Sequence, residues 1–178
     1  MPVSIVRWLD DSEIDGSIDA FVAKYDDGSL DGAADLLLFY KAMMEAGKKS
    51  GESDDEDKKE LSEIMKDDIE EYESLAYFSE IRGSDEKTVQ VLLPDSQKLG
   101  IWEGTYDEAP ADVDGTPVKN CVFMEMTPET MMQIMKGNPN TDAQFFSGDL
   151  TVKGSLKLAT KPREWIYSFM DFIGKETD

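Results

Sequence analysis

Apolar residues in the first part of the chain recur at the spacing of amphipathic helices. Residues 14–25, 36–44 and 61–72 each carry such a stripe, and this spacing predicts three helices. Residues 47–60 contain glycine, serine and charged residues without a large apolar side chain, which predicts a solvated linker. We therefore expect an acidic helical extension over residues 1–50, followed by a second domain over residues 51–178.

From residue 74 onwards the apolar pattern becomes typical of β-strands. The segments with this pattern are 75–81, 88–93, 99–103, 120–126 and 149–153. Each has a strand-like run of apolar and β-branched or aromatic residues, and turn-forming residues separate the first three. The intervening residues 105–117 are rich in Asp, Pro, Gly and Ala, so they predict a loop. Five strands in a mostly antiparallel sheet follow from this order.

Helices are predicted before and after the last strand. Thr127 can cap a short helix that begins at Pro128 and stops at Gly137. A second short helix is expected around residues 142–147, and residues 156–173 predict a long final helix. Pro162 is expected to interrupt that helix, because an internal proline loses a hydrogen bond at a cost of about 3 kcal/mol.

The predicted fold class is α+β. Its five-stranded, mostly antiparallel sheet is expected to be covered by helices on one face, with the helical extension added at the N-terminus.

Composition excludes several classes of function. The 178 residues include 39 acidic and 18 basic side chains, for a formal net charge of -21, so we expect no nucleic-acid partner. Histidine is absent, which excludes Ser-His-Asp and Cys-His catalysis. The single cysteine, Cys121, excludes an intramolecular disulfide and fits a reducing compartment.

The distribution of apolar residues gives an expectation about membranes and location. No stretch approaches the roughly 18 consecutive apolar residues of a membrane span, so we expect no stable membrane insertion and a cytoplasmic protein. We also expect no cofactor and no resident metal.

Two acidic motifs are candidates for chemistry. Residues 10–19 and 26–35 resemble the start of calcium loops, but Val22 and Leu38 stand where the bidentate glutamate belongs. Helix N-termini that carry acidic residues explain both motifs better. Paired carboxylates such as Asp67 and Asp68 are interpreted as a solvated helix face rather than an acid–base pair.

Residues 122–173 are rich in methionine and aromatic residues. An ordinary hydrophobic core is one explanation, and a Met-lined wall that adapts to ligands of variable shape is another. The order of motifs favours the second explanation. Residues 127–139, Thr-Pro-Glu-Thr-Met-Met-Gln-Ile-Met-Lys-Gly-Asn-Pro, are followed by Phe-Phe-Ser-Gly-Asp-Leu-Thr-Val-Lys-Gly at 145–154. This arrangement resembles the sterol carrier protein type 2 (sterol transfer) family, closely over residues 120–159.

The resemblance implies an apolar tunnel between the sheet and the last helix, with its entrance near that helix. The candidate lining residues are Met131, Met135, Phe145, Phe146, Leu150, Val152, Leu156, Trp165, Phe169 and Ile173. The expected function is non-enzymatic binding, and transfer, of a lipid such as a fatty acyl chain, acyl-CoA, sterol or isoprenoid. An interaction or dimerisation module with a filled core is the alternative, and a small acidic enzyme that uses carboxylates or a metal is a third option.

Overall fold

The computed structural model describes residue 3, residues 6–84 and residues 88–175. The helices, in chain order, are α1 (Asp11–Ile14), α2 (Ser17–Asp27), α3 (Leu36–Glu52), α4 (Glu60–Glu71), α5 (Pro128–Met135), α6 (Asp142–Ser147) and α7 (Leu156–Phe172), with short 3-10 helices η1 (Glu56–Lys58) and η2 (Pro94–Ser96). The strands are β1 (Arg7–Trp8), β2 (Leu75–Ile81), β3 (Val89–Leu93), β4 (Lys98–Trp102), β5 (Asp112–Val113), β6 (Thr116–Pro117), β7 (Asn120–Met126) and β8 (Leu150–Gly154).

The main sheet contains six strands within these described residues, in the order β1-β4-β3-β2-β7-β8. Strands β2 and β7 pair in parallel, and the other neighbours pair antiparallel. The α+β class and the five expected strands are therefore confirmed. The sixth strand, β1, was missed because two residues are too few to show an alternating pattern. A small hairpin, β5-β6, lies inside the segment expected to be a loop.

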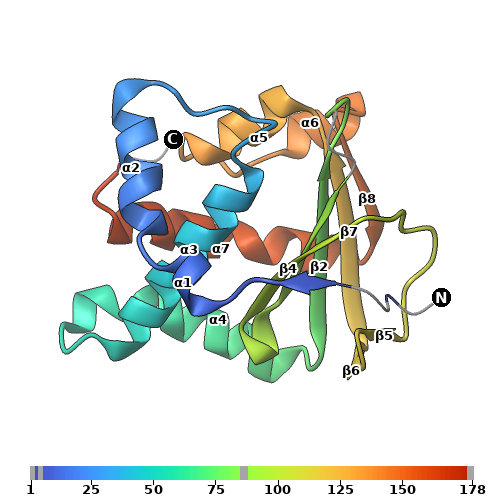
Figure 1. The fold of residues 1–178 in the computed structure, drawn as a ribbon, viewed down its shortest axis with the longest axis horizontal. Helices are drawn as coiled ribbons and strands as arrows, with labels where there is room; N and C mark the ends of the chain where they lie inside the picture. The colour runs from blue at the N-terminus through green and yellow to red at the C-terminus, as the bar shows by residue number, and fades with distance from the viewer. Residues whose placement is uncertain (1–2, 4–5, 85–87, 176–178) are drawn as a thin grey trace.

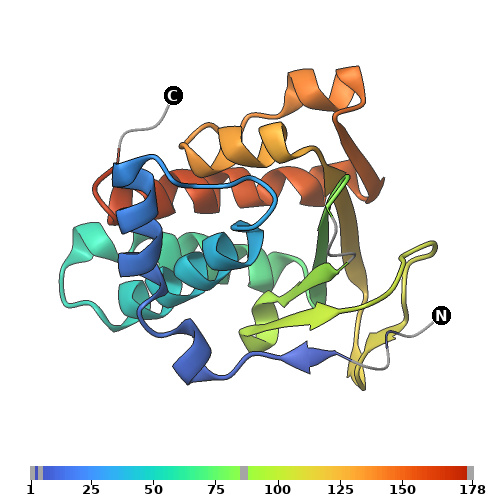
Figure 2. The ribbon, with the colours of Figure 1, turned by 45° about the horizontal axis from the view of Figure 1, so that its top comes forward.

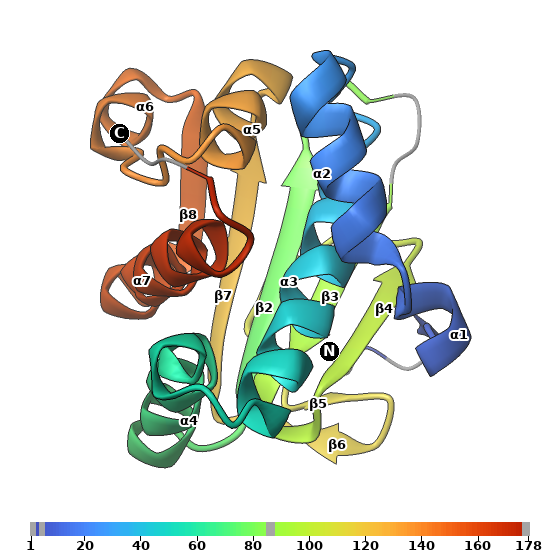
Figure 3. The same ribbon diagram turned by 90° about the vertical axis from the view of Figure 1, so that its left-hand side faces the viewer.

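The two faces of the sheet are covered differently. The helices gather on one face, as Figures 1 and 3 show, and residues such as Tyr77 and Met124 point into that layer. The segment that contains β5 and β6 lies on the other face (Figure 2). Its residues Tyr106 and Val113 form an apolar cluster with Phe78 and Phe123 of the sheet. Tyr106 of that segment stacks between these two rings, with centroid separations of 5.0 Å to each. Central strand β2 is consequently buried on both faces.

The N-terminal helices share the hydrophobic core of the sheet and α7. The rings of Phe21 and Phe39 each lie 5.7 Å from the ring of Phe169, which is fully buried. Helix α3 also runs through the expected boundary at residue 50 and ends at Glu52, so the first part of the expected linker at 47–60 is helical. The division of the chain into two domains stays a prediction.

Ser50 explains why the segment after residue 47 continues as helix α3 instead of forming a solvated linker. Its fully buried hydroxyl donates to the carbonyl oxygen of Lys58 and accepts from the backbone N–H of Ser62, at 3.1 Å. This side chain joins the end of α3 to the start of α4. The polar composition of the segment gave no sign of this contact.

The two acidic motifs serve local backbone structure. Asp10 caps α1 in a reciprocal capping box with Glu13. Before α3, the Asp31 carboxylate accepts the backbone N–H groups of Ala33 and Ala34, which lower its pKa. These contacts agree with the interpretation of both motifs as helix starts.

Candidate functional site

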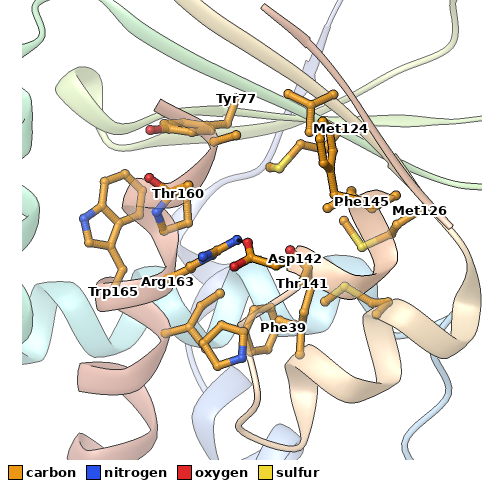
Figure 4. A pocket seen from close by; sticks show the side chains of 18 of the residues that line it. Phe39, Tyr77, Met124, Met126, Thr141, Asp142, Phe145, Thr160, Arg163 and Trp165 are labelled. Atoms are coloured by element: carbon orange, nitrogen blue, oxygen red, sulfur yellow. Dashed lines mark hydrogen bonds and ion pairs between the residues drawn. The ribbon is translucent and has the colours of Figure 1, made fainter. Parts of the chain in front are cut away.

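A cavity of about 310 Å³ lies between the helical layer and the sheet. Strands β2, β3, β7 and β8 form one side of it, and helices α3, α5, α6 and α7 form the others. In Figure 4, Tyr77 and Met124 project from the sheet side, and Phe39 of α3 faces them across the space. The lining residues are Phe39, Tyr40, Met43, Tyr77, Leu92, Met124, Met126, Met131, Ile134, Pro139, Thr141, Asp142, Phe145, Phe146, Leu150, Val152, Leu156, Ala159, Thr160, Pro162, Arg163, Trp165 and Ile166.

Strand alternation accounts for the sheet side of this wall. Met124 and Met126 of β7 point to the helical layer, while Phe123 next to Met124 points to the opposite face. On β8, Leu150 and Val152 share the cavity side, as the sequence predicted. The wall is therefore built largely from unbranched thioethers, aliphatic groups and aromatic rings, which tolerate ligands of different shape.

Seven of the ten predicted lining residues border the cavity. They are Met131, Phe145, Phe146, Leu150, Val152, Leu156 and Trp165. Met135, Phe169 and Ile173 lie outside its lining: Met135 and Phe169 are fully buried in the core, and Ile173 packs against the core just after α7 ends. Phe169 packs instead against the rings of Phe21 and Phe39. The sequence did not reveal that these two residues lie against α7.

Sequence reasoning missed the lining residues contributed by α3 and β2. Phe39, Tyr40 and Met43 fall on the predicted apolar stripe of α3, but nothing in that stripe identified the surface it packs against. Tyr77 could have been found, because β2 alternates Leu75 and Tyr77 on the helical side with Ala76 and Phe78 on the other side.

Pro162 does not interrupt the last helix, contrary to the sequence prediction. Helix α7 is continuous from Leu156 to Phe172 with Pro162 inside it. A proline at this position cannot donate to the carbonyl of Leu158, four residues earlier. The buried Tyr77 hydroxyl donates to that carbonyl oxygen instead, at 3.0 Å. Tyr77 therefore stabilises an uninterrupted helix along the cavity, and its burial raises the pKa of its phenol.

One carboxylate expected on a solvated face is buried beside the cavity. Asp68 of α4 is 7% exposed and accepts a hydrogen bond from Trp165 Nε1 at 2.7 Å. Lys161 Nζ lies 3.7 Å from its other carboxylate oxygen. The interpretation of Asp68 as solvated is thus wrong. Its contacts with α7 hold the Trp165 indole, which lines the cavity, in a fixed orientation.

A charged pair and the exposed Thr160 lie at the rim, whereas Thr141 beside them is buried. Arg163 Nη2 of α7 contacts Asp142 Oδ1 of α6 at 2.6 Å, and Figure 4 shows this pair beside Thr141 and Thr160. The Asp142 side chain is 63% exposed, so the pair sits where the cavity meets solvent. The same rim carries exposed apolar residues, with Phe146 84% and Leu156 53% exposed.

Metal-binding and membrane-spanning features are both missing from the described ranges of the chain. In these ranges, no group of three or more Cys, Asp or Glu side chains is arranged to hold a metal ion. Nor is any helix in them both long enough and apolar enough to cross a membrane. The cytoplasmic location stays a prediction.

Comparison with known proteins agrees with the resemblance seen in the sequence. The family model of the SCP-2 sterol transfer family matches residues 67–165. A solved structure described as "UbiJ-SCP2 Ubiquinone synthesis protein" is 11% identical, with a TM-score of 0.39, and the match covers 55% of this chain and 69% of that chain. No curated protein matches the chain.

The family match extends from α4 through the sheet and into α7. It includes β2, β7 and β8, which form the sheet side of the cavity, and it ends at Trp165 in the cavity wall. Since the match spans more than half of the 178 residues, the chain belongs to the SCP-2 sterol transfer family.

Proposed function

We propose that this protein binds the apolar part of a lipid in the cavity between the sheet and α7, and transfers it without covalent chemistry. Family membership supports lipid binding and transfer in general. The observation that carries the proposal is the apolar cavity of about 310 Å³, walled by side chains such as Met124, Met126 and Trp165. Fatty acyl chains, acyl-CoA, sterols and isoprenoids all present an apolar part to such a wall.

Partition out of water supplies the driving force for this function. The cavity volume lies at the lower end of the roughly 300–1,000 Å³ typical of ligand sites. Each methylene group moved from water into it gains about 0.8 kcal/mol. A chain of about ten methylenes would therefore gain on the order of 8 kcal/mol before the cost of ordering it.

The rim favours one orientation of the lipid. Arg163, Asp142 and the exposed Thr160 offer charge and a hydroxyl group where the cavity meets solvent. A polar head group can keep its hydration there while the chain lies against the apolar wall, which includes Met131 and Val152. Burying that head group among the methionines would cost free energy, because the wall offers it few hydrogen-bond partners.

The alternative function, an interaction module on the same fold, was expected to have a filled core. An apolar space of this size weighs against that alternative. Retention of lipid separates the two functions experimentally, because a carrier should retain lipid and a module with a filled core should not.

Native mass spectrometry with lipid extraction is the direct test. Protein purified from cells without detergent should carry stoichiometric lipid, and the extracted lipid identifies the ligand class. Protein that is empty, and that also ignores an added fluorescent fatty acid, would refute the proposal.

Two cavity variants and a matched control locate the site. Val152→Asp places a charge in the cavity wall, and Ala159→Phe fills the space, so both should abolish uptake of the fluorescent fatty acid. Thr151→Asp introduces the same carboxylate at the adjacent, exposed position of β8, which faces away from the cavity, and should leave uptake intact. Equal uptake by all three folded variants would contradict the assignment of the cavity as the binding site.

A further inference from the structure

One ion pair supplies the charge of the cavity wall. Arg163 is the one basic residue and Asp142 the one acidic residue among the lining residues that the structure describes. Arg163 Nη2 donates to Asp142 Oδ1 at 2.6 Å, and Figure 4 shows the two side chains meeting between α7 and α6. Discrimination between charged and uncharged ligands in this cavity therefore depends on this pair.

Helix α7 holds Arg163 on the cavity side. Leu156, Ala159, Arg163 and Ile166 all line the cavity, and their spacing of three or four residues places them on one face of the helix. That face continues past Pro162, because α7 is not interrupted there. A ligand whose chain lies along this apolar face can therefore meet the guanidinium where the cavity opens to solvent.

The two members of the pair differ in their exposure to water. The Arg163 side chain is 27% exposed, whereas the Asp142 side chain is 63% exposed. An ion pair with a largely exposed member stabilises a protein little, so the Asp142 carboxylate can turn into solvent at small cost. An anionic head group can then take its place on the less exposed guanidinium. A cationic head group would have to displace the more buried member, which favours an anion.

The contacts of the guanidinium favour a carboxylate as that anion. Within the described residues, Asp142 Oδ1 is the one acceptor that contacts Arg163, and it does so at Nη2. A guanidinium carries five N–H donors in a planar fork that matches the two oxygens of a carboxylate. A ligand carboxylate can therefore accept two parallel hydrogen bonds where Asp142 accepts one. A fatty acid presents this group, whereas the hydroxyl of a sterol or of an isoprenoid alcohol offers a single uncharged oxygen.

We propose that Arg163 selects ligands with an ionised carboxylate head group, and that Asp142 competes for the same guanidinium. This inference rests on the proposed lipid-binding function, because it concerns the polar end of the molecule whose apolar part lies in the cavity. The net charge of -21 opposes any anion, but charges more than about 8 Å apart are largely screened at physiological ionic strength. Asp149 and Glu164, the acidic residues nearest to the pair in sequence, are exposed and lie outside the lining.

Competition for an uncharged probe measures the head-group preference. The full chain is loaded with the neutral fluorescent dye Nile red, whose binding Ala159→Phe should abolish, and is titrated with dodecanoate and with dodecanol. These ligands have equal numbers of carbon atoms, so the ratio of their affinities isolates the head group. Arg163→Gln should lower the preference for dodecanoate by about five- to tenfold and leave the affinity for dodecanol unchanged. Asp142→Asn, at an exposed position, should raise that preference by about two- to fivefold, because it removes the competing carboxylate.

A control variant and a third ligand complete the test. Lys157→Gln removes the same charge from an exposed position of α7 outside the lining, where Lys157 Nζ lies over the Tyr72 ring, so it should leave the affinity ratio unchanged. A ratio that is the same in the wild type, Arg163→Gln and Asp142→Asn would overturn this inference and leave the cavity function standing. A preference for dodecylamine that Asp142→Asn removes would overturn it as well, by assigning the rim to a cation. Failure of the wild type to bind any of these ligands would instead refute the cavity function itself.

Discussion

The hydrogen bond from Tyr77 to α7 predicts an energetic coupling between Tyr77 and Pro162. Pro162 leaves the carbonyl of Leu158 without its usual helical donor, and the Tyr77 hydroxyl occupies that place at 3.0 Å. Tyr77→Phe removes the hydroxyl and keeps the ring, whose centroid lies 5.5 Å from that of Trp165. The variant therefore isolates one hydrogen bond from the packing around it.

The magnitude depends on the residue at position 162. With proline there, Tyr77→Phe leaves a buried carbonyl unsatisfied, which costs about 1–3 kcal/mol in the free energy of unfolding. With Pro162→Ala, the new backbone N–H can donate to Leu158, so the same loss falls to about 0.5–1.5 kcal/mol. The difference, about 1 kcal/mol, is the coupling free energy of a double-mutant cycle.

Urea denaturation of lipid-free protein, followed by circular dichroism, measures all four members of the cycle. Tyr40→Phe is the matched control, because Tyr40 also lines the cavity but its hydroxyl pairs with Ser79 Oγ at 2.6 Å. Removing the Tyr40 hydroxyl should lower the free energy of unfolding by the same amount in the wild-type and Pro162→Ala backgrounds. If Tyr77→Phe likewise costs the same in both backgrounds, the Tyr77 hydroxyl does not compensate for the proline and the reasoning is refuted.

Three other predictions concern stability. Asp68→Ala should lower the free energy of unfolding by about 1.5–3 kcal/mol in urea denaturation, because the buried Trp165 indole N–H loses a charged acceptor; a neutral result would contradict this role. Gly32→Ala should lower the melting temperature, since a Cβ there would overlap the carbonyl of Pro128, whereas Gly47→Ala in α3 meets an ordinary contact and should raise it. Burial raises the pKa values of Tyr40 and Tyr77 above the unfolded value of 10.0. The unfolded chain therefore loses these protons first, and chemical denaturation should show full stability below about pH 10 that declines above it; constant stability to about pH 11 would refute this.

The strands were predictable because each carries its own signal. The bounds of β2 and β7 match the expected ranges, and the other three predicted strands differ from them by one residue at their ends. Thr127 and Pro128 likewise marked the start of α5, where the Thr127 hydroxyl accepts from the backbone N–H of Thr130. Such local patterns depend only on residues nearby in the sequence, so they predict these elements without knowledge of the fold.

The errors occurred where a distant residue changes the meaning of a local pattern. Pro162 is a helix breaker by itself, and Tyr77, far away in sequence, supplies the bond that it removes. Asp68 belongs to a polar run, but Trp165 brings it into the core. Phe169 has the spacing of a lining residue, and the N-terminal helices cover it. The sequence contains each partner but does not state which residues meet.

The shape of the cavity depends on a helix that lies outside the family match. Helix α3 lies outside the matched residues 67–165, yet Phe39, Tyr40 and Met43 of that helix close one side of the cavity. The hydrogen bond between Tyr40 and Ser79 of β2 fixes this side against the sheet. The family match covers the strands from β2 to β8 and the first part of α7, whereas α3 helps to set the size and shape of the space between them. Selection among acyl chains and ring systems should therefore respond to changes at Phe39 and Met43 as strongly as to changes within the matched segment.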